Sequence, residues 1–77
     1  MDVINNRFGI LLAEKRVDEK RNIPLAEVAE KTGIARKTLY AWQSNSVTRA
    51  EFKIIDALCS YFDVQPGELF EYIPDDK

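Results

Sequence analysis

The sequence predicts an all-α fold, and two observations support this prediction. Between Leu25 and Gln43 the apolar, small and glycine positions are spaced as two short helices that cross at a tight turn. On either side of this stretch, apolar residues recur three or four positions apart, which is the spacing of amphipathic helices. With only 77 residues, the chain is expected to form a single domain, residues 1–77, made of five helices.

The composition limits the function classes and indicates a compartment. The chain is 45% hydrophobic and 31% charged, which is ordinary for a soluble globular protein. No apolar run approaches the ~20 residues of a membrane span or the pattern of a signal peptide, so we expect a cytoplasmic protein without membrane contact. A core of this size is marginal, so stability should depend on close helix packing or on self-association.

The first helix is expected from about Asn6 to Glu19. A polar segment, VDEKRNI, follows it, and Pro24 suits the first position of a second helix because a missing N–H costs nothing there. The apolar stripe of the first helix consists of Ile4, Phe8, Leu11 and Leu12.

The second helix is marked by its apolar spacing and by a glycine after its last turn. Val28 and Ala29 follow Leu25 by three and four positions, and Gly33 can take the left-handed conformation that ends a helix. The small side chain of Ala29 lets the second and third helices approach each other closely.

The third helix is expected from about Ala35 to Ser44, with two chemically different sides. One side is apolar and the other is polar, so one suits the core and the other suits a partner. The apolar side holds Ile34, Leu39 and Trp42, and the polar side holds Arg36, Lys37, Tyr40 and Gln43.

Two further helices complete the predicted domain. Residues 44–46, Ser-Asn-Ser, form a turn sequence. A fourth helix is expected from about Arg49 to Phe62, and a short fifth one opens at Gln65, Pro66 and Gly67 and runs through Phe70; Pro74 ends the ordered chain. The apolar stripe of the fourth helix consists of Phe52, Ile55, Leu58, Cys59 and Phe62.

These residues resemble the helix-turn-helix of Cro and lambda-repressor-like regulators. The segment FKIIDALCSYFDVQPGELFEYIPDD further resembles the last helices and tail of a small single-domain branch of that superfamily. The resemblance covers residues 24–76 and implies a compact five-helix lambda-repressor-like DNA-binding domain with its helix-turn-helix at residues 25–44. Counted from Leu25, it rests on the fourth, fifth, ninth, tenth, fifteenth and eighteenth positions: Val28, Ala29, Gly33, Ile34, Leu39 and Trp42.

The sequence departs from the family pattern in three places. Thr32 occupies the usually apolar eighth position, where its methyl group can still pack. Ala35 stands where a serine or threonine cap is common. Pro24 and Leu25 replace the polar pair that usually opens the first motif helix, which removes a side chain that family members often use to hold a DNA phosphate.

The charges form a dipole along the chain, although the net charge is only −2. Residues 31–50 hold Lys31, Arg36, Lys37 and Arg49 and no acidic residue, whereas residues 51–77 hold two basic and seven acidic ones. A DNA backbone would be attracted to the middle of the chain, while the acidic tail at residues 71–77 points away. The alternative is a solvated basic loop of no consequence.

Eight residues are candidate DNA contacts. Arg36 and Lys37 begin the third helix, the end that enters the major groove first in such a motif, and both oppose the helix dipole without structural benefit. We expect Arg36 to read a guanine through two hydrogen bonds and Lys37 to contact a base or a phosphate. Tyr40 could equally cover the edge of the core. The remaining candidates, for phosphate or base contacts, are Thr38, Tyr40, Gln43, Ser44, Arg49 and Lys53.

No pattern indicates an enzyme, a cofactor or a metal site. The chain has one cysteine and no histidine, so neither an activated nucleophile nor a metal site of nitrogen and thiolate ligands is available. Cys59 is therefore interpreted as a small buried hydrophobe. Trp42 offers a stacking surface for single-stranded bases, but its register with Leu39 favours burial in the core.

The predicted function is sequence-specific binding of double-stranded DNA by a transcriptional regulator, with repression as the favoured mode. The alternative is a helical protein-interaction module, such as an antitoxin-like or accessory subunit, whose basic helix contacts an acidic partner. The operator sequence, the direction of regulation, any inducing signal and the chromosomal, phage or plasmid context are left open.

A homodimer is also expected, because two copies related by a two-fold axis would read two half-sites about 34 Å apart. The apolar residues that suggest it lie in the last helix and tail. The alternative is that they cap the monomer core, with Val3 and Ile4 pairing against Tyr72 and Ile73 as short strands. The residues concerned are Phe62, Val64, Leu69, Phe70, Tyr72 and Ile73.

Overall fold

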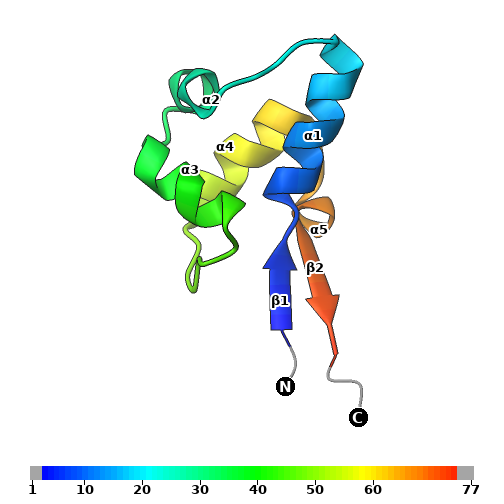
Figure 1. The fold of residues 1–77 in the computed structure, drawn as a ribbon. Helices are drawn as coiled ribbons and strands as arrows, with labels where there is room; N and C mark the ends of the chain where they lie inside the picture. Colours follow the sequence, from blue (N-terminus) through cyan, green and yellow to red (C-terminus); the bar gives the residue numbers. More distant parts are fainter. Residues whose placement is uncertain (1–2, 75–77) are drawn as a thin grey trace.

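Five helices pack around one core, and two short strands project from it as a ribbon (Figure 1). The computed structural model describes residues 3–74. The all-α class, the five helices and the short terminal strands are confirmed. In chain order the elements are β1 (Val3–Asn6), α1 (Phe8–Glu19), α2 (Leu25–Thr32), α3 (Arg36–Gln43), α4 (Phe52–Phe62), α5 (Pro66–Leu69) and β2 (Phe70–Ile73).

The ribbon is antiparallel and joins the two ends of the described chain. Its root is held by Arg7, whose backbone N–H donates to the Leu69 carbonyl at 2.7 Å and whose guanidinium donates to the Glu68 carbonyl at 3.0 Å. Ile4 is therefore a strand residue, and its assignment to the stripe of the first helix is wrong. The paired residues are Val3 with Ile73, Ile4 with Tyr72, Asn5 with Glu71 and Asn6 with Phe70.

The helix α1 begins two residues later than expected, because Asn6 belongs to β1. The Asn6 side-chain oxygen accepts the backbone N–H of Phe8 at 3.0 Å and so satisfies one free donor of the first turn. At the other end, Arg16 donates two hydrogen bonds, at 3.2 and 2.7 Å, to the carbonyl of Ile23. This contact holds the loop that brings Ile23, in the polar segment, into full burial.

Arg21 ties the same loop to α2. Its guanidinium donates to both carboxylate oxygens of Glu27, at 2.9 and 2.5 Å, and to Glu19 at 2.9 Å. The hydrogen bond from Arg21 lowers the pKa of the Glu27 carboxyl below its ordinary value. These groups remain in contact with water, so their contribution to stability is small.

The turn between α2 and α3 is closed by a glycine and a threonine. Gly33 has a φ of 76°, and its N–H donates to the Ala29 carbonyl at 2.9 Å. The Thr32 hydroxyl donates to the Val28 carbonyl at 2.7 Å and accepts the N–H of Ile34 at 3.2 Å. Thr32, which stands where the family pattern has an apolar residue, thus forms one hydrogen bond to each side of the turn.

The helix α4 begins at Phe52 and not at Arg49, because the chain is still extended at Glu51, with φ −89° and ψ 144°. Phe52 was expected in the core, yet its side chain is 88% exposed. At 3.6 residues per turn, Phe52 points roughly 90° away from the mean direction of Ile55, Leu58 and Phe62. The prediction for Phe52 is therefore wrong. Its spacing of three residues from Ile55 is helical, but this spacing does not place Phe52 on the buried face that Ile55, Leu58 and Phe62 share.

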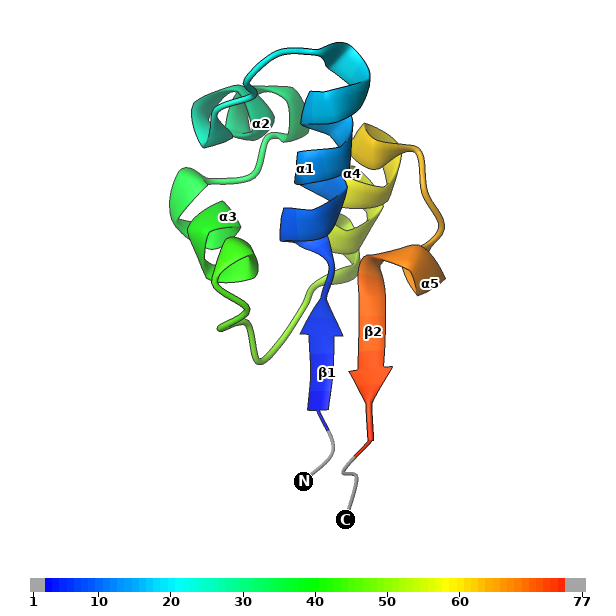
Figure 2. The ribbon, with the colours of Figure 1, turned by 45° about the vertical axis from the view of Figure 1, so that its right-hand side comes forward.

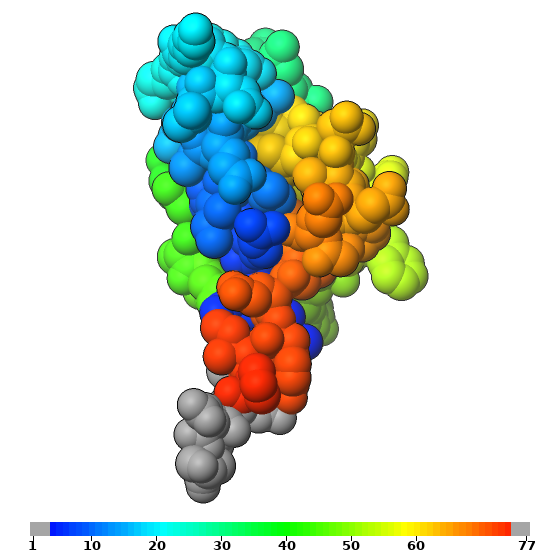
Figure 3. Space-filling model, turned by 90° about the vertical axis from the view of Figure 1, so that its right-hand side faces the viewer, coloured from blue at the N-terminus to red at the C-terminus, as the bar shows by residue number. Residues whose placement is uncertain are grey.

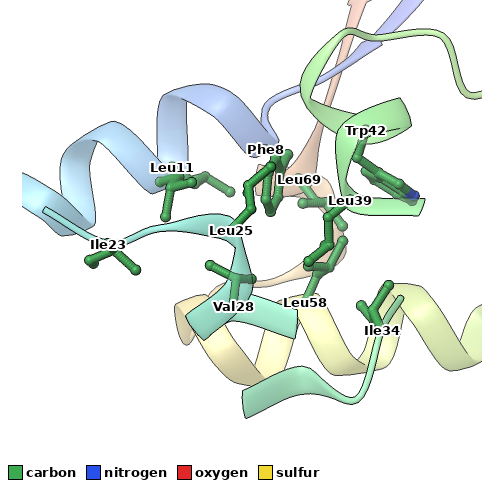
Figure 4. Close-up of a cluster of buried hydrophobic side chains, with 11 residues drawn as sticks. Phe8, Leu11, Ile23, Leu25, Val28, Ile34, Leu39, Trp42, Leu58 and Leu69 are labelled. Atoms are coloured by element: carbon green, nitrogen blue, oxygen red, sulfur yellow. The ribbon is translucent and has the colours of Figure 1, made fainter. Parts of the chain in front are cut away.

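Every helix contributes at least one side chain to the core (Figure 4). Phe8 packs edge to face against Phe62, with ring centroids 5.7 Å apart. The ring centroids of Trp42 and Phe70 are 5.8 Å apart. Leu69 is fully buried and cannot belong to an outer dimer surface. The buried set is Phe8, Leu11, Leu12, Ile23, Leu25, Val28, Ile34, Leu39, Trp42, Leu58 and Leu69.

Replacing Thr32 with valine should lower the free energy of unfolding by about 1–2 kcal/mol. Valine keeps the methyl group and the shape but leaves the Ile34 N–H without its partner. Urea denaturation followed by circular dichroism measures the change, and Thr48→Val, at an exposed loop position, is the matched control. Equal stability of the two variants would show that the Thr32 hydroxyl does not hold the turn.

Candidate nucleic-acid interface

The helix α3 lies at the side of the domain, next to α2 (Figure 2). One face of the helix is buried and the other is exposed. Leu39 is fully buried and Trp42 is 2% exposed, so these two side chains anchor the helix to the core. The opposite face presents polar and charged side chains to solvent. Its exposed residues are Arg36, Lys37, Tyr40 and Gln43, as expected from the helical spacing.

Arg36 and Lys37 are the first two residues of α3. The residue before them, Ala35, is extended, and no side chain caps the helix. Among the described residues neither cation takes part in an ion pair. Two positive charges therefore stand at the positive end of the helix dipole, uncompensated by the fold and available to an anionic partner.

Thr38 and Lys53 come together beside the start of α3, although they are far apart in sequence. Thr38 is half-buried and Lys53 is exposed in the first turn of α4. Both line a shallow depression between the turn at Gly33 and the start of α4. Lys53 therefore lies near the start of α3, the helix whose first two residues are Arg36 and Lys37.

The other candidates lie at the far end of α3. Gln43 is the last residue of the helix, and the Ser44 hydroxyl contacts the Ala41 carbonyl at 3.3 Å and the Ser46 hydroxyl at 3.0 Å. Arg49 is exposed in the loop before α4. Tyr40 lies between the candidate residues at the two ends of α3. Its side chain is 59% exposed, so it is available for contacts with a partner and does not cover the edge of the core.

Asn45 fastens the end of α3 to the ribbon, a role that the sequence did not reveal beyond its turn chemistry. It adopts a left-handed backbone, with φ 57°. Its side-chain oxygen accepts the backbone N–H of Asn6 at 3.0 Å and the Asn6 side-chain amide at 3.2 Å. Its own amide donates to the Asn5 side chain. These hydrogen bonds set the position of the end of α3 relative to β1.

Two residues with possible chemical roles are structural. Trp42 is part of the core, which confirms the interpretation made from its register. Cys59 is half-buried against the core, and burial raises the pKa of its thiol, so the reactive thiolate is disfavoured.

None of the helices within residues 3–74 has the length and apolar character of a membrane span. The same part of the chain has no group of three or more cysteine or acidic side chains that could hold a metal ion.

The fold and the exposed basic helix define a helix-turn-helix domain. The profile of the Cro/C1-type helix-turn-helix DNA-binding domain matches residues 11–75. The chain therefore belongs to this family.

A solved structure supports the same assignment. The crystal structure of a candidate DNA-binding protein from Bacteroides fragilis is similar to this chain, with a TM-score of 0.68 and 25% sequence identity. The match covers 90% of this chain and 100% of that one. No curated protein matches the sequence.

Replacing Asn45 with alanine should lower the free energy of unfolding by about 1–3 kcal/mol, because its hydrogen bonds are lost and alanine disfavours a positive φ. Asn45→Gly separates the two causes, since glycine keeps the left-handed backbone and removes only the side chain. Urea denaturation measures both variants, with Asn22→Ala in an exposed loop as control. Wild-type stability of both Asn45 variants would contradict the fastening role.

Proposed function

We propose that this chain is a transcriptional regulator, acting as a repressor, that reads a specific double-stranded DNA sequence by placing α3 in the major groove. The observation that carries the proposal is the division of α3: its apolar side chains are buried, while its polar side chains are exposed and unpaired with any acidic residue in the described chain. A surface helix of this kind can approach DNA without rearrangement of the core.

The polar residues of α3 supply two kinds of contact. Arg36, at the start of the helix, is suited to two hydrogen bonds with a guanine edge, and Lys37 to a base or a phosphate. Tyr40 and Gln43 follow on the same face. Residues at both ends of the helix, Thr38 and Lys53 on one side and Ser44 and Arg49 on the other, are suited to the flanking phosphates.

The charge distribution supports the same orientation. Residues 31–50 carry four positive charges and no negative one, whereas the last third of the chain is acidic. The basic part attracts the phosphate backbone and the acidic part is repelled by it, so long-range forces turn α3 towards DNA. A protein with this activity works in the compartment that contains the DNA, which for a bacterial-type regulator is the cytoplasm.

A second copy of the chain is part of the proposal. One domain contacts only a few base pairs, and a two-fold pair reads two half-sites. Of the apolar residues that suggested a dimer, Phe62, Val64 and Phe70 pack against the core, while Tyr72 and Ile73 remain exposed. These two exposed residues form only a small apolar surface, so we expect the proposed dimer surface to include other residues as well.

The first test is selection of bound sequences from a random DNA pool, followed by a mobility shift at several salt concentrations. We expect one selected sequence to bind tightly and its affinity to fall steeply as salt rises, because phosphate contacts release counterions. Binding of an acidic protein partner, with no shift on any DNA, would favour the interaction-module alternative.

The second test separates base reading from backbone contact. Arg36→Ala should cost about 1–3 kcal/mol on the selected sequence and relax the preference for it, whereas Arg49→Ala should weaken all sequences alike and reduce the salt slope by about 1. Lys20→Gln removes an exposed charge at the end of α1 and should change neither. Equal and small effects of both arginine variants would contradict the assignment of α3 as the recognition helix.

A further inference from the structure

A groove of about 220 Å³ lies between the ribbon and the loop that follows α3. Ile4 and Phe70 line it from the ribbon, and Val47 and Ala50 line it from the loop. Trp42 also lines it. The groove is therefore mostly apolar, and its volume is sufficient for one aromatic side chain.

Phe52 is the counterpart of this groove. It is the first residue of α4, two positions after Ala50, and at 88% it is the most exposed of the large apolar side chains described in residues 4–74. Transferring a phenylalanine side chain from water to an apolar site is strongly favourable. Single exposed apolar residues are common, but an almost fully exposed phenyl ring close to an apolar groove is typical of an interaction surface.

The groove and Phe52 lie next to each other along the chain, because Ala50 lines the groove and Phe52 follows two positions later. In Figure 3 the start of α4 projects from the right side of the molecule, above the ribbon, which projects downwards. A protruding side chain beside a hollow of matching size is what a two-fold interface needs, because each copy then gives and receives the same contact.

The charges around the two features are also complementary. Glu51 adjoins Phe52, and Arg49 lines the groove. Neither residue forms an ion pair within the described chain. When Phe52 of one copy enters the groove of another, Glu51 of the first approaches Arg49 of the second.

We propose that the partner on this surface is a second copy of the chain, and that each copy inserts Phe52 into the groove of the other. The inference rests on the proposed function in one respect: a DNA-reading pair needs a two-fold axis near the recognition helices. The groove satisfies this requirement, because the loop that lines it is continuous with the end of α3. Insertion would also cover Ile4, which is 67% exposed.

Sedimentation velocity over a range of micromolar concentrations, without DNA, tests the contact directly. Wild type should dimerise, whereas Phe52→Glu and Ala50→Trp, which fills the groove, should each weaken association by about a hundredfold or more. Both sites are exposed, so both variants should unfold in urea as wild type does. Val17→Glu, at a 74% exposed apolar position on α1, is the matched control and should leave the dimer intact.

Mixing the two variants provides a stricter test. The Phe52→Glu copy keeps an open groove and the Ala50→Trp copy keeps its phenyl ring, so the pair retains one of the two contacts. We therefore expect a mixed dimer, stronger than either variant forms alone and weaker than wild type. Native mass spectrometry distinguishes the mixed species by mass.

Binding to a single half-site separates this inference from the proposed function. Phe52→Ser, which adds no negative charge beside Lys53, should retain half-site affinity and lose only the gain from a second, symmetric half-site. A wild-type monomer at all concentrations, a dimer unaffected by Phe52→Glu, or loss of half-site binding in Phe52→Ser would overturn the contact. A Phe52-dependent dimer that binds no DNA would instead overturn the function and leave the contact standing.

Discussion

The helix α3 is stable because Leu39 and Trp42 are buried. The helix α3 has eight residues, and isolated helices shorter than about 12 residues are barely stable in water. It also lacks a side-chain cap and begins with two cations that oppose its dipole. Burial of two large apolar side chains, each contributing about 1.5–3 kcal/mol, compensates for these deficits. Since one face holds the helix, the residues of the other face need not contribute to folding and are available for binding.

Two short polar side chains complete the placement of α3. The Thr32 hydroxyl bridges the turn before it, and the Asn45 amide fastens the loop after it to β1. Burial sets which face of the helix points inwards, whereas these hydrogen bonds limit how far the helix can slide or tilt. A helix held at both ends loses little conformational freedom on binding, which favours affinity for a partner of fixed shape.

The ribbon lies close to both of the proposed surfaces, the one for DNA and the one for self-association. By pairing the two ends of the chain, it forms one wall of a groove whose other wall is the loop after α3. Arg49 lies in that loop, between the end of α3 and the exposed Phe52. The surface proposed to join two copies is therefore next to the surface proposed to contact DNA. In the proposed dimer, such closeness would let the contact fix the spacing of the two α3 helices.

The sequence by itself determined the helices of the motif, the turn at Gly33 and the two faces of α3. Helical spacing and a glycine after the last turn are local properties, which neighbouring residues decide. The tertiary structure alone decided the role of Asn45, the burial of Ile23 and the exposure of Phe52. Asn45 meets a residue 39 positions away, and burial depends on which surfaces converge once all helices have packed. Local spacing carries no information about such distant contacts, and therefore the groove and its complementary side chain became visible only in the folded chain.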